Sequence, residues 1–315
     1  MRTDTFFIMS KTDELLLSVF AAEPENPDQP VKGIVQIVHG TREHKERYLP
    51  FMQYMTDAGY ACICHDHRGH GKSVRNPEDL GYMYSAGMDG FLSDVHQITK
   101  LARKRWPDLP VIQFGHGSGA LAVLCMLRKW EEAVSCVILS GCPCINHLAA
   151  AGTLLAKLRR GTYRRGRSKL LKQITAMPYD KRFPGERTEY NWLCRNQEAV
   201  EEYNEDPLCG FELAADGQEV VLNLMRSAYR KGRWKTAKQD LPILFIGGAD
   251  DPYIGTPALF HQTLKAVRNL GYNNVKGKLY PQLRHEILNE EEKFLVFGDV
   301  EKYLDLVLGQ TSVEQ

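Results

Sequence analysis

The stretch of sequence that decides the fold is PVIQF at residues 110–114, followed by GHGSG at 115–119 and ALAVLCMLRK at 120–129. The first segment is a short apolar run that predicts a buried strand, and the third has the apolar spacing of a helix. Between them, Gly115 and Gly119 stand two residues before and two residues after Gly117, which permits a very tight turn. The pattern therefore predicts a strand–turn–helix unit with one residue at its apex.

Similar units recur along the chain. Apolar runs that predict strands are found at 31–38, 60–64, 110–114, 134–139, 242–246 and 275–280, and helical spacing is found at 49–58, 88–105, 120–129, 257–270 and 291–308. Strands buried on both faces and separated by amphipathic helices are typical of a parallel sheet with crossover helices. Residues 5–9 and 15–20, with Lys11-Thr12-Asp13 between them, predict an antiparallel hairpin at the sheet edge.

Polar residues follow four of the predicted strands. His39-Gly40-Thr41 ends the strand at 31–38, the GHGSG turn follows 110–114, Asp250 and Asp251 follow 242–246, and His285 comes soon after 275–280. A turn, an acid and a histidine thus occur in the chain order of an α/β-hydrolase, each beyond the carboxyl end of a strand. The sequence predicts that these residues meet at one edge of the sheet.

Five motifs carry a resemblance to a known family. They are HGTREH at 39–44, DHRGHGKS at 66–73, FGHGSG at 114–119, GADDP at 248–252 and HEILNE at 285–290. With YNWL at 190–193 and DPLCGF at 206–211, the chain resembles the monoacylglycerol lipase and lysophospholipase-like (serine aminopeptidase-type) branch of the α/β-hydrolases. The resemblance implies an α/β fold with a mostly parallel eight-stranded sheet, helices on both faces and a helical cap. It also implies hydrolysis of a carboxylic ester, with a small lipid or ester as substrate and without metal or organic cofactor.

The sequence departs from this family at the apex of the turn. The family pattern has serine where this chain has Gly117, and the nearest serine, Ser118, is displaced by one residue. A shift of one residue into the following helix rotates the hydroxyl by about 100°. Three explanations are open: a deliberate Ser→Gly change that traps substrate, a natural loss of activity, or use of Ser118 through a distorted turn.

The resemblance assigns roles to the other site residues. A serine at position 117 would attack the ester carbonyl, with His285 as general base and acid. Asp251 fits the family spacing better than Asp250 and would orient the imidazole. The backbone amides of Thr41 and Ser118 would form the oxyanion hole. With glycine at the nucleophile position we expect little or no turnover, and the rival prediction is a non-catalytic protein of the same fold that binds an acyl ligand.

Composition limits the function classes. The 315 residues are 43% apolar and 25% charged, which excludes extensive disorder. The formal net charge is +1, so the chain as a whole has no electrostatic field that would attract nucleic acid. We expect no membrane-spanning segment and no signal peptide. The eight cysteines are few and lie mostly beside apolar runs, so we expect free thiols and a cytoplasmic protein.

Two further stretches have competing interpretations. His65, His67 and His70 around Asp66 could suggest a metal site, but we favour a structural loop in which Asp66 and Arg68 form a buried pair. His116 is expected to be structural.

The strand–helix alternation stops between 144 and 239, so we expect a core at 1–143 and 240–315 with a helical cap, or lid, at 144–239. Eight basic residues in the sixteen from 157 to 172 predict either a solvated face or peripheral contact with anionic lipid.

Overall fold

A computed structural model describes residues 1–145, 152, 165–167, 179–183, 188, 190–232 and 234–311. Its centre is a single sheet with the strand order β1-β2-β4-β3-β5-β6-β7-β8. The strands are β1 (Arg2–Met9), β2 (Leu16–Glu23), β3 (Ile34–Val38), β4 (Ala61–His65), β5 (Val111–His116), β6 (Cys136–Ser140), β7 (Ile243–Gly248) and β8 (Val275–Tyr280). The predicted eight-stranded sheet is confirmed, and each predicted strand overlaps an observed one.

The pairing of the strands follows the prediction as well. β1 pairs with β2 in antiparallel fashion, and β2 also runs antiparallel to β4. The other neighbouring strands are parallel, from β4 and β3 through to β8. Strands β3 to β7 are buried along their whole length, which explains their continuous apolar character, whereas β8 lies at the sheet edge and its three residues from Lys276 to Lys278 are exposed.

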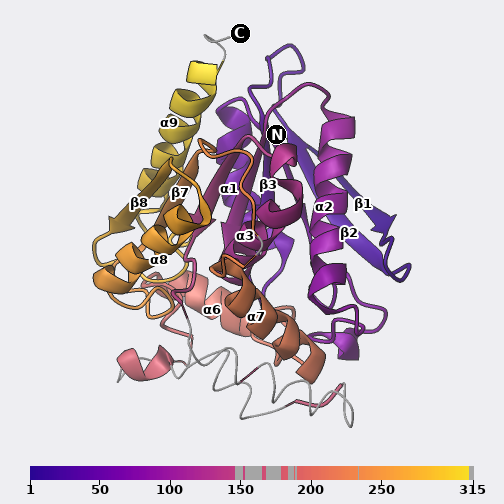
Figure 1. Ribbon diagram of the computed structural model, residues 1–315. Helices are drawn as coiled ribbons and strands as arrows, with labels where there is room; N and C mark the ends of the chain where they lie inside the picture. Colours follow the sequence, from indigo (N-terminus) through magenta and orange to yellow (C-terminus); the bar gives the residue numbers. More distant parts are fainter. Residues whose placement is uncertain are drawn as a thin grey trace.

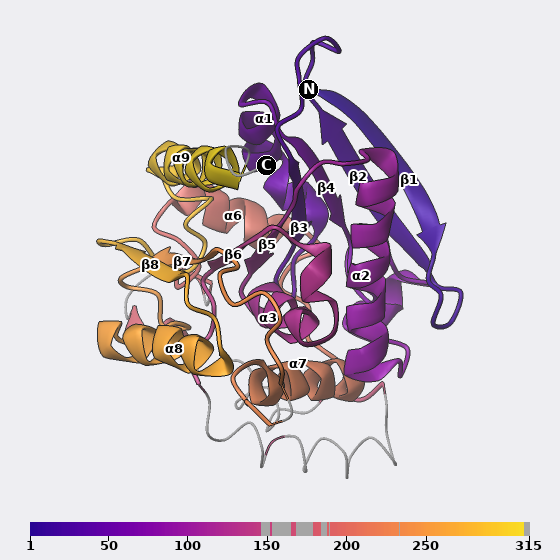
Figure 2. The ribbon, with the colours of Figure 1, turned by 45° about the horizontal axis from the view of Figure 1, so that its top comes forward.

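Helices cover both faces of the sheet (Figures 1 and 2). One apolar layer joins the sheet to α1 (Leu49–Asp57) and α9 (Lys293–Thr311). The opposite layer joins it to α2 (Gly87–Arg105), α3 (Ser118–Trp130), α7 (Ala215–Ala228) and α8 (Pro257–Leu270). None of the helices that the structure describes is long and apolar enough to cross a bilayer.

The connection between β6 and β7 contains helices where it is described. They are the short 3-10 helix η4 (Tyr179–Arg182), α6 (Gln197–Glu205) and α7. α7 packs against α2 and α3, and its apolar residues Val220, Leu224 and Met225 belong to the same core layer as those helices. Apart from residues 165–167, the basic segment predicted at 157–172 lies outside the described residues, as does most of 147–156. The division into core and cap stays a prediction.

Candidate active site

The strand–turn–helix unit has the sharp geometry that its glycines predict. β5 ends at His116, α3 begins at Ser118, and Gly117 between them has φ 54° and ψ −119°. A Cβ on Gly119 would lie 2.0 Å from the carbonyl oxygen of Val38, and one on Gly115 would lie 2.7 Å from the Cα of Ala120. Larger residues at these two positions would therefore collide with the neighbouring backbone.

Residue 117 stands at the apex of this turn and faces His285. An ideal Cβ built on Gly117 would lie 3.3 Å from Nε2 of His285, and no other heavy atom of the described residues, apart from those adjoining in the chain, comes closer to that point. The Gly117 amide donates to the carbonyl of Ser140 at the end of β6, which holds the apex to the neighbouring strand. A side chain at this position would therefore point directly at the imidazole.

Ser118 occupies a different position. It is the first residue of α3 and is 4% exposed. Between these two described residues no hydrogen bond joins the Ser118 hydroxyl to His285. The structure therefore gives no sign of a distorted turn that brings Ser118 to the imidazole.

His285 and Asp251 meet although they are far apart in the sequence. Nδ1 of His285 lies 2.9 Å from Oδ2 of Asp251, and both side chains are buried. The other oxygen of Asp251 accepts from the Tyr253 amide at 2.7 Å, so the carboxylate is fixed on both sides. Asp250, by contrast, is exposed. Burial opposes the charged imidazole, but the adjacent Asp251 outweighs it and raises the pKa of His285 above 6.5.

Another glycine, Gly141, makes room for this histidine. Gly141 follows β6 with φ 54°, and a Cβ there would lie 2.9 Å from both Nδ1 and Cε1 of the His285 ring. Any side chain at position 141 would displace the imidazole from Asp251. Sequence reasoning missed this residue, because a glycine after a strand is usually explained by the turn alone.

The loop that follows β3 carries the first expected oxyanion donor. The amides of Thr41 and Ser118 donate no hydrogen bond within the part of the chain that the structure describes, and both residues line the pocket in front of His285. Two neighbouring residues hold the loop. Glu43 accepts from the Gly40 amide at 2.5 Å, and Arg42, with φ 69°, is tied to the segment before α7.

The contacts of Arg42 join this loop to the connection between β6 and β7. Its backbone oxygen accepts from the hydroxyl of Tyr203 and the amide of Gly210. Its guanidinium donates to the carbonyls of Gly210 and Phe211. The loop that contains Thr41 is therefore positioned in part by residues about 160 positions farther along the chain.

A pocket opens in front of these groups. It has a cavity volume of about 50 Å³, and aromatic rings of Tyr179, Trp192, Tyr203 and Tyr253 line it together with Gly117 and His285. The rings of Trp192 and Tyr253 lie 5.1 and 5.0 Å from the His285 ring, measured between centroids. Aromatic rings therefore border the imidazole on the side of the pocket, while the charged residues Arg42, Glu43 and Glu286 line other parts of it.

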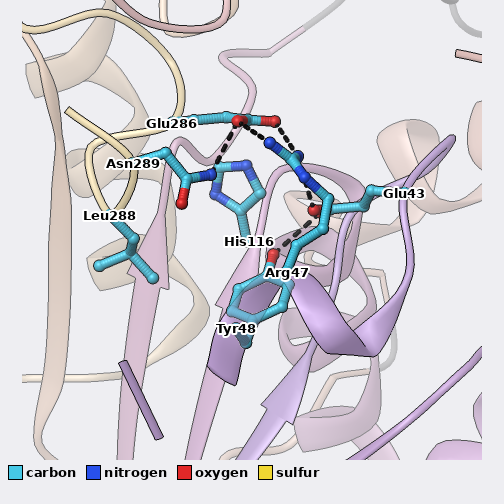
Figure 3. A pocket seen from close by; sticks show the side chains of 7 residues that line it. All are labelled: Glu43, Arg47, Tyr48, His116, Glu286, Leu288 and Asn289. Atoms are coloured by element: carbon cyan, nitrogen blue, oxygen red, sulfur yellow. Dashed lines mark hydrogen bonds and ion pairs between the residues drawn. The ribbon is translucent and has the colours of Figure 1, made fainter. Parts of the chain in front are cut away.

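A buried cluster of charged residues, Glu43, Arg47 and Glu286, lies next to the site (Figure 3). Arg47 binds Glu286 through both of its terminal nitrogens at 2.5 and 2.6 Å and contacts Glu43 at 3.3 Å. Tyr48 donates to the other oxygen of Glu43 at 2.9 Å. Burial raises the pKa of Glu43; burial also acts to raise that of Glu286, but Arg47 overcomes it and lowers the pKa to about 2.

This cluster links the two loops that carry the site. Glu43 fixes the loop of Thr41 through the Gly40 amide, and Glu286 adjoins His285 in the chain. Arg47 joins the two carboxylates across the pocket wall that Figure 3 shows, beside His116. His116 also contacts the Ser140 hydroxyl at 3.4 Å, and burial lowers its pKa to about 3, so it is neutral. Sequence reasoning did not find the cluster.

The histidines near Asp66 form a second buried group. The rings of His39 and His67 are tilted by 31° with their centroids 3.9 Å apart, and Nδ1 of His67 lies 3.3 Å from Nε2 of His65. The predicted pair of Asp66 with Arg68 is wrong. Asp66 instead accepts from the Lys45 ammonium at 2.8 Å, and Arg68 binds Asp94 and Asp13. Lys45 follows β3 and Asp66 follows the neighbouring strand β4, so the two residues meet at the carboxyl edge of the sheet. The spacing of residues in the sequence could not predict this pair.

His44 is the residue whose surroundings most resemble a metal site. Its ring nitrogens lie 2.8 Å from Glu46 and 2.7 Å from Asp206, and Cys209 or Asp66 offers a third ligand atom nearby. Burial acts to lower the pKa of His44, but the two carboxylates overcome it and raise the pKa. Both nitrogens are therefore donors in a charged imidazolium, and as placed they have no free lone pair for a cation.

These features define a class of protein. The sequence profile described as "Serine aminopeptidase, S33" matches residues 29–292, and the chain belongs to this family of hydrolases. A monoacylglycerol lipase of Mycolicibacterium smegmatis is 28% identical over 286 residues, which cover 88% of this chain and 90% of that protein. A monoglyceride lipase of Rattus norvegicus is 24% identical over 277 residues, which cover 84% of this chain and 82% of that protein.

Solved structures agree on the fold. A thermostable carboxyl esterase from Bacillus coagulans superposes with a TM-score of 0.87 at 22% identity, over 98% of this chain and 99% of that one. A monoglyceride lipase variant from Saccharomyces cerevisiae gives a TM-score of 0.78 at 17% identity, over 98% and 96%. By family, this chain is a hydrolase, and its fold is the α/β-hydrolase fold of these esterase and lipase structures.

Proposed function

We propose that this chain is a carboxylic ester hydrolase of the monoacylglycerol lipase and lysophospholipase kind whose acyl-enzyme chemistry is blocked at one position. The observation that carries the proposal is the 3.3 Å distance from the Cβ position of residue 117 to Nε2 of His285, at a residue that is glycine. With Asp251, His285 and the two amides arranged around that point, only the nucleophile is missing.

In the restored enzyme each residue would have a defined role. A hydroxyl at position 117 would attack the ester carbonyl while His285 takes its proton. Asp251 would stabilise the resulting imidazolium, and the amides of Thr41 and Ser118 would bind the oxyanion. His285 would then return the proton to the leaving alcohol, and water would release the acid by the same steps.

The experiment is the variant Gly117→Ser. We expect hydrolysis of p-nitrophenyl butyrate to rise by at least about 10³-fold, because loss of a serine nucleophile costs that much or more in related hydrolases. The restored serine should also react with a fluorophosphonate probe. Gly117→Ala is the matched control, since it adds the Cβ without the hydroxyl and should gain nothing.

The alternative is a protein that binds an acyl ligand and has no chemistry. Gly117 favours this alternative, because the pocket that would bind an acyl ligand is present and the nucleophile is absent. If Gly117→Ser folds but stays inert and unlabelled, while the unmodified chain binds a monoacylglycerol in calorimetry, this alternative holds. Esterase activity of the unmodified chain that disappears in Ser118→Ala would contradict both proposals.

Contact with a membrane and location in the cytosol are finer proposals. The cytosolic proposal is supported by eight cysteines that are all unbridged. The membrane proposal depends on basic residues at 157–172, of which the described Arg165 pairs with Asp79 at 3.2 Å. Stronger sedimentation with anionic than with neutral vesicles would support it, and equal sedimentation would contradict it.

A further inference from the structure

The glycine at position 117 leaves a specific point open beside the imidazole. The nearest heavy atoms to the Cβ position, outside residues 116 to 118, are Nε2 of His285 at 3.3 Å, Cε1 of the same ring at 3.7 Å and Cα of Gly40 at 3.9 Å. That point is one bond length from the Gly117 Cα, so a water oxygen lies beyond it on the side of the pocket, where no Cβ of residue 117 excludes it. There the water can reach hydrogen-bond distance from Nε2 of His285, which lines the same pocket.

The groups around this point are those that general-base catalysis needs. Nδ1 of His285 is bound to Asp251, which leaves Nε2 as the basic nitrogen on the side of Gly117. The buried Glu43 and Glu286 carry two carboxylates against the single guanidinium of Arg47, so their neighbourhood favours an imidazolium. The amides of Thr41 and Ser118 border the same pocket and are available to an oxyanion.

We propose that the unmodified chain hydrolyses activated esters by direct attack of water in place of the serine hydroxyl, without an acyl-enzyme. This inference rests on the proposed function, because it uses the same pocket. His285 Nε2 takes a proton from water as the water oxygen bonds to the ester carbonyl carbon. The carbonyl oxygen becomes an oxyanion held by the two amides. The carbon–alkoxy bond then breaks, and the imidazolium gives its proton to the leaving alcohol.

The balance is ester plus water to acid plus alcohol, with no covalent intermediate and no other reactant. A route without an acyl-enzyme has three consequences. Product release shows no burst, a fluorophosphonate does not inhibit, and an added alcohol does not receive the acyl group. The substrates are esters with good leaving groups, such as p-nitrophenyl acetate, because water is a weak nucleophile that nothing here holds covalently.

The test compares four forms of the full-length chain on p-nitrophenyl acetate. His285→Ala should lower the rate by about 10²-fold or more, since it removes the general base. Gly117→Ala should lower it by at least about tenfold, because its Cβ, 3.3 Å from Nε2, takes up the space through which the water contacts that nitrogen. Gly87→Ala should keep the full rate. It is the matched control for backbone strain, since Gly87 also has a positive φ of 65° and a Cβ there meets nothing within 4 Å.

The outcomes separate this inference from the proposed function. A rate equal in the unmodified chain and in His285→Ala overturns the water route, as does inhibition of the unmodified chain by a fluorophosphonate. If Gly117→Ser is nevertheless active, the proposed function stands and only the water route fails. If Gly117→Ala is as active as the unmodified chain, the water does not use the space beside Gly117 and the inference is wrong. A circular dichroism melt of each variant establishes that a lost rate is not lost folding.

Discussion

His285 and a separate group of buried histidines lie at the carboxyl edge of the same sheet, and the effect of their surroundings on the imidazole pKa is opposite. His285 is bound to Asp251, and the pKa of its imidazole is raised. His39, His65 and His67 contact one another, and burial together with neighbouring histidines holds the pKa of each well below 6.5. All four side chains are buried, so burial alone does not decide the charge. The comparison teaches that the partner of a buried histidine decides whether it can accept a proton.

The hydrogen bonds of the second group explain its neutrality. Nε2 of His39 accepts from the His67 amide, and Nδ1 of His70 donates to the carbonyl of Arg68. Among the described residues, Nδ1 of His65 and Nε2 of His70 are buried without a hydrogen-bond partner, which fits neutral imidazoles in which these nitrogens carry no proton. Through these bonds the histidine side chains hold the backbone of residues 67 and 68, whereas His285 lines the pocket. One group supports the structure and the other has the geometry of a base.

The largest expected effect removes the carboxylate from His285. In the Gly117→Ser background, Asp251→Asn should lower kcat by about 10⁴-fold, because the imidazole loses both its orientation and its counter-charge. The measurement is steady-state hydrolysis of p-nitrophenyl butyrate across pH. Asp250→Asn is the matched control and should change little, because that side chain is exposed. Comparable losses in both variants would contradict the assignment of Asp251.

The next effect concerns the charges behind His285. Arg47→Met should destabilise the fold by about 3–5 kcal/mol, because it leaves the buried carboxylates of Glu43 and Glu286 without their cation. Urea denaturation at pH 7.5 measures it. Replacing both carboxylates as well, in Arg47→Met with Glu43→Gln and Glu286→Gln, should recover much of the loss. A single variant as stable as the unmodified chain would show that the cluster is not an ion-pair network.

A smaller effect is the pH dependence of folding stability that comes from His70, which also tests the contrast with His285. Burial lowers the pKa of His70 to about 4 in the folded chain, against about 6.5 when unfolded. The unfolded state therefore binds the proton first, so the contribution of His70 is fully present above pH 6.5 and is lost as the pH falls from 6.5 towards 4. At pH 5 the loss is about 2 kcal/mol for this residue.

Urea denaturation at pH 7.5 and pH 5 gives the measurement. His70→Asn keeps a donor for the Arg68 carbonyl but does not titrate, so its stability should fall less between the two pH values. An equal fall in both proteins would contradict the neutral state of His70. His285 has the opposite sign, because its raised pKa favours the folded state at low pH.

Much of the fold could be predicted from local pattern. The buried strands and the helices at 49–57 and 257–270 follow from apolar periodicity and agree with the structure to within a few residues. The boundary of β3 was less accurate, because the predicted run began at residue 31 and the ladder begins at Ile34. Ladder hydrogen bonds, and not apolar character, decide where a strand starts.

The candidate site divides in the same way. Gly117, Asp251 and His285 were named because each follows a strand, and parallel strands bring their carboxyl ends together. The pairs Arg47–Glu286 and Lys45–Asp66 were not named, since their members are 239 and 21 residues apart and no local spacing connects them. A charged residue in a loop gives no sign of which distant carboxylate it will meet.

The sequence by itself determined the order of strands and helices, the tight turn at residues 115–119 and the absence of a hydroxyl at its apex, because these depend on neighbours in the chain. Only the tertiary structure decided that the apex faces His285 Nε2 at 3.3 Å, that Gly141 makes room for the ring and that Arg47 joins two buried carboxylates. Those relations arise when crossover connections bring separate strand ends to one edge. They are fixed by packing between segments that no local pattern links.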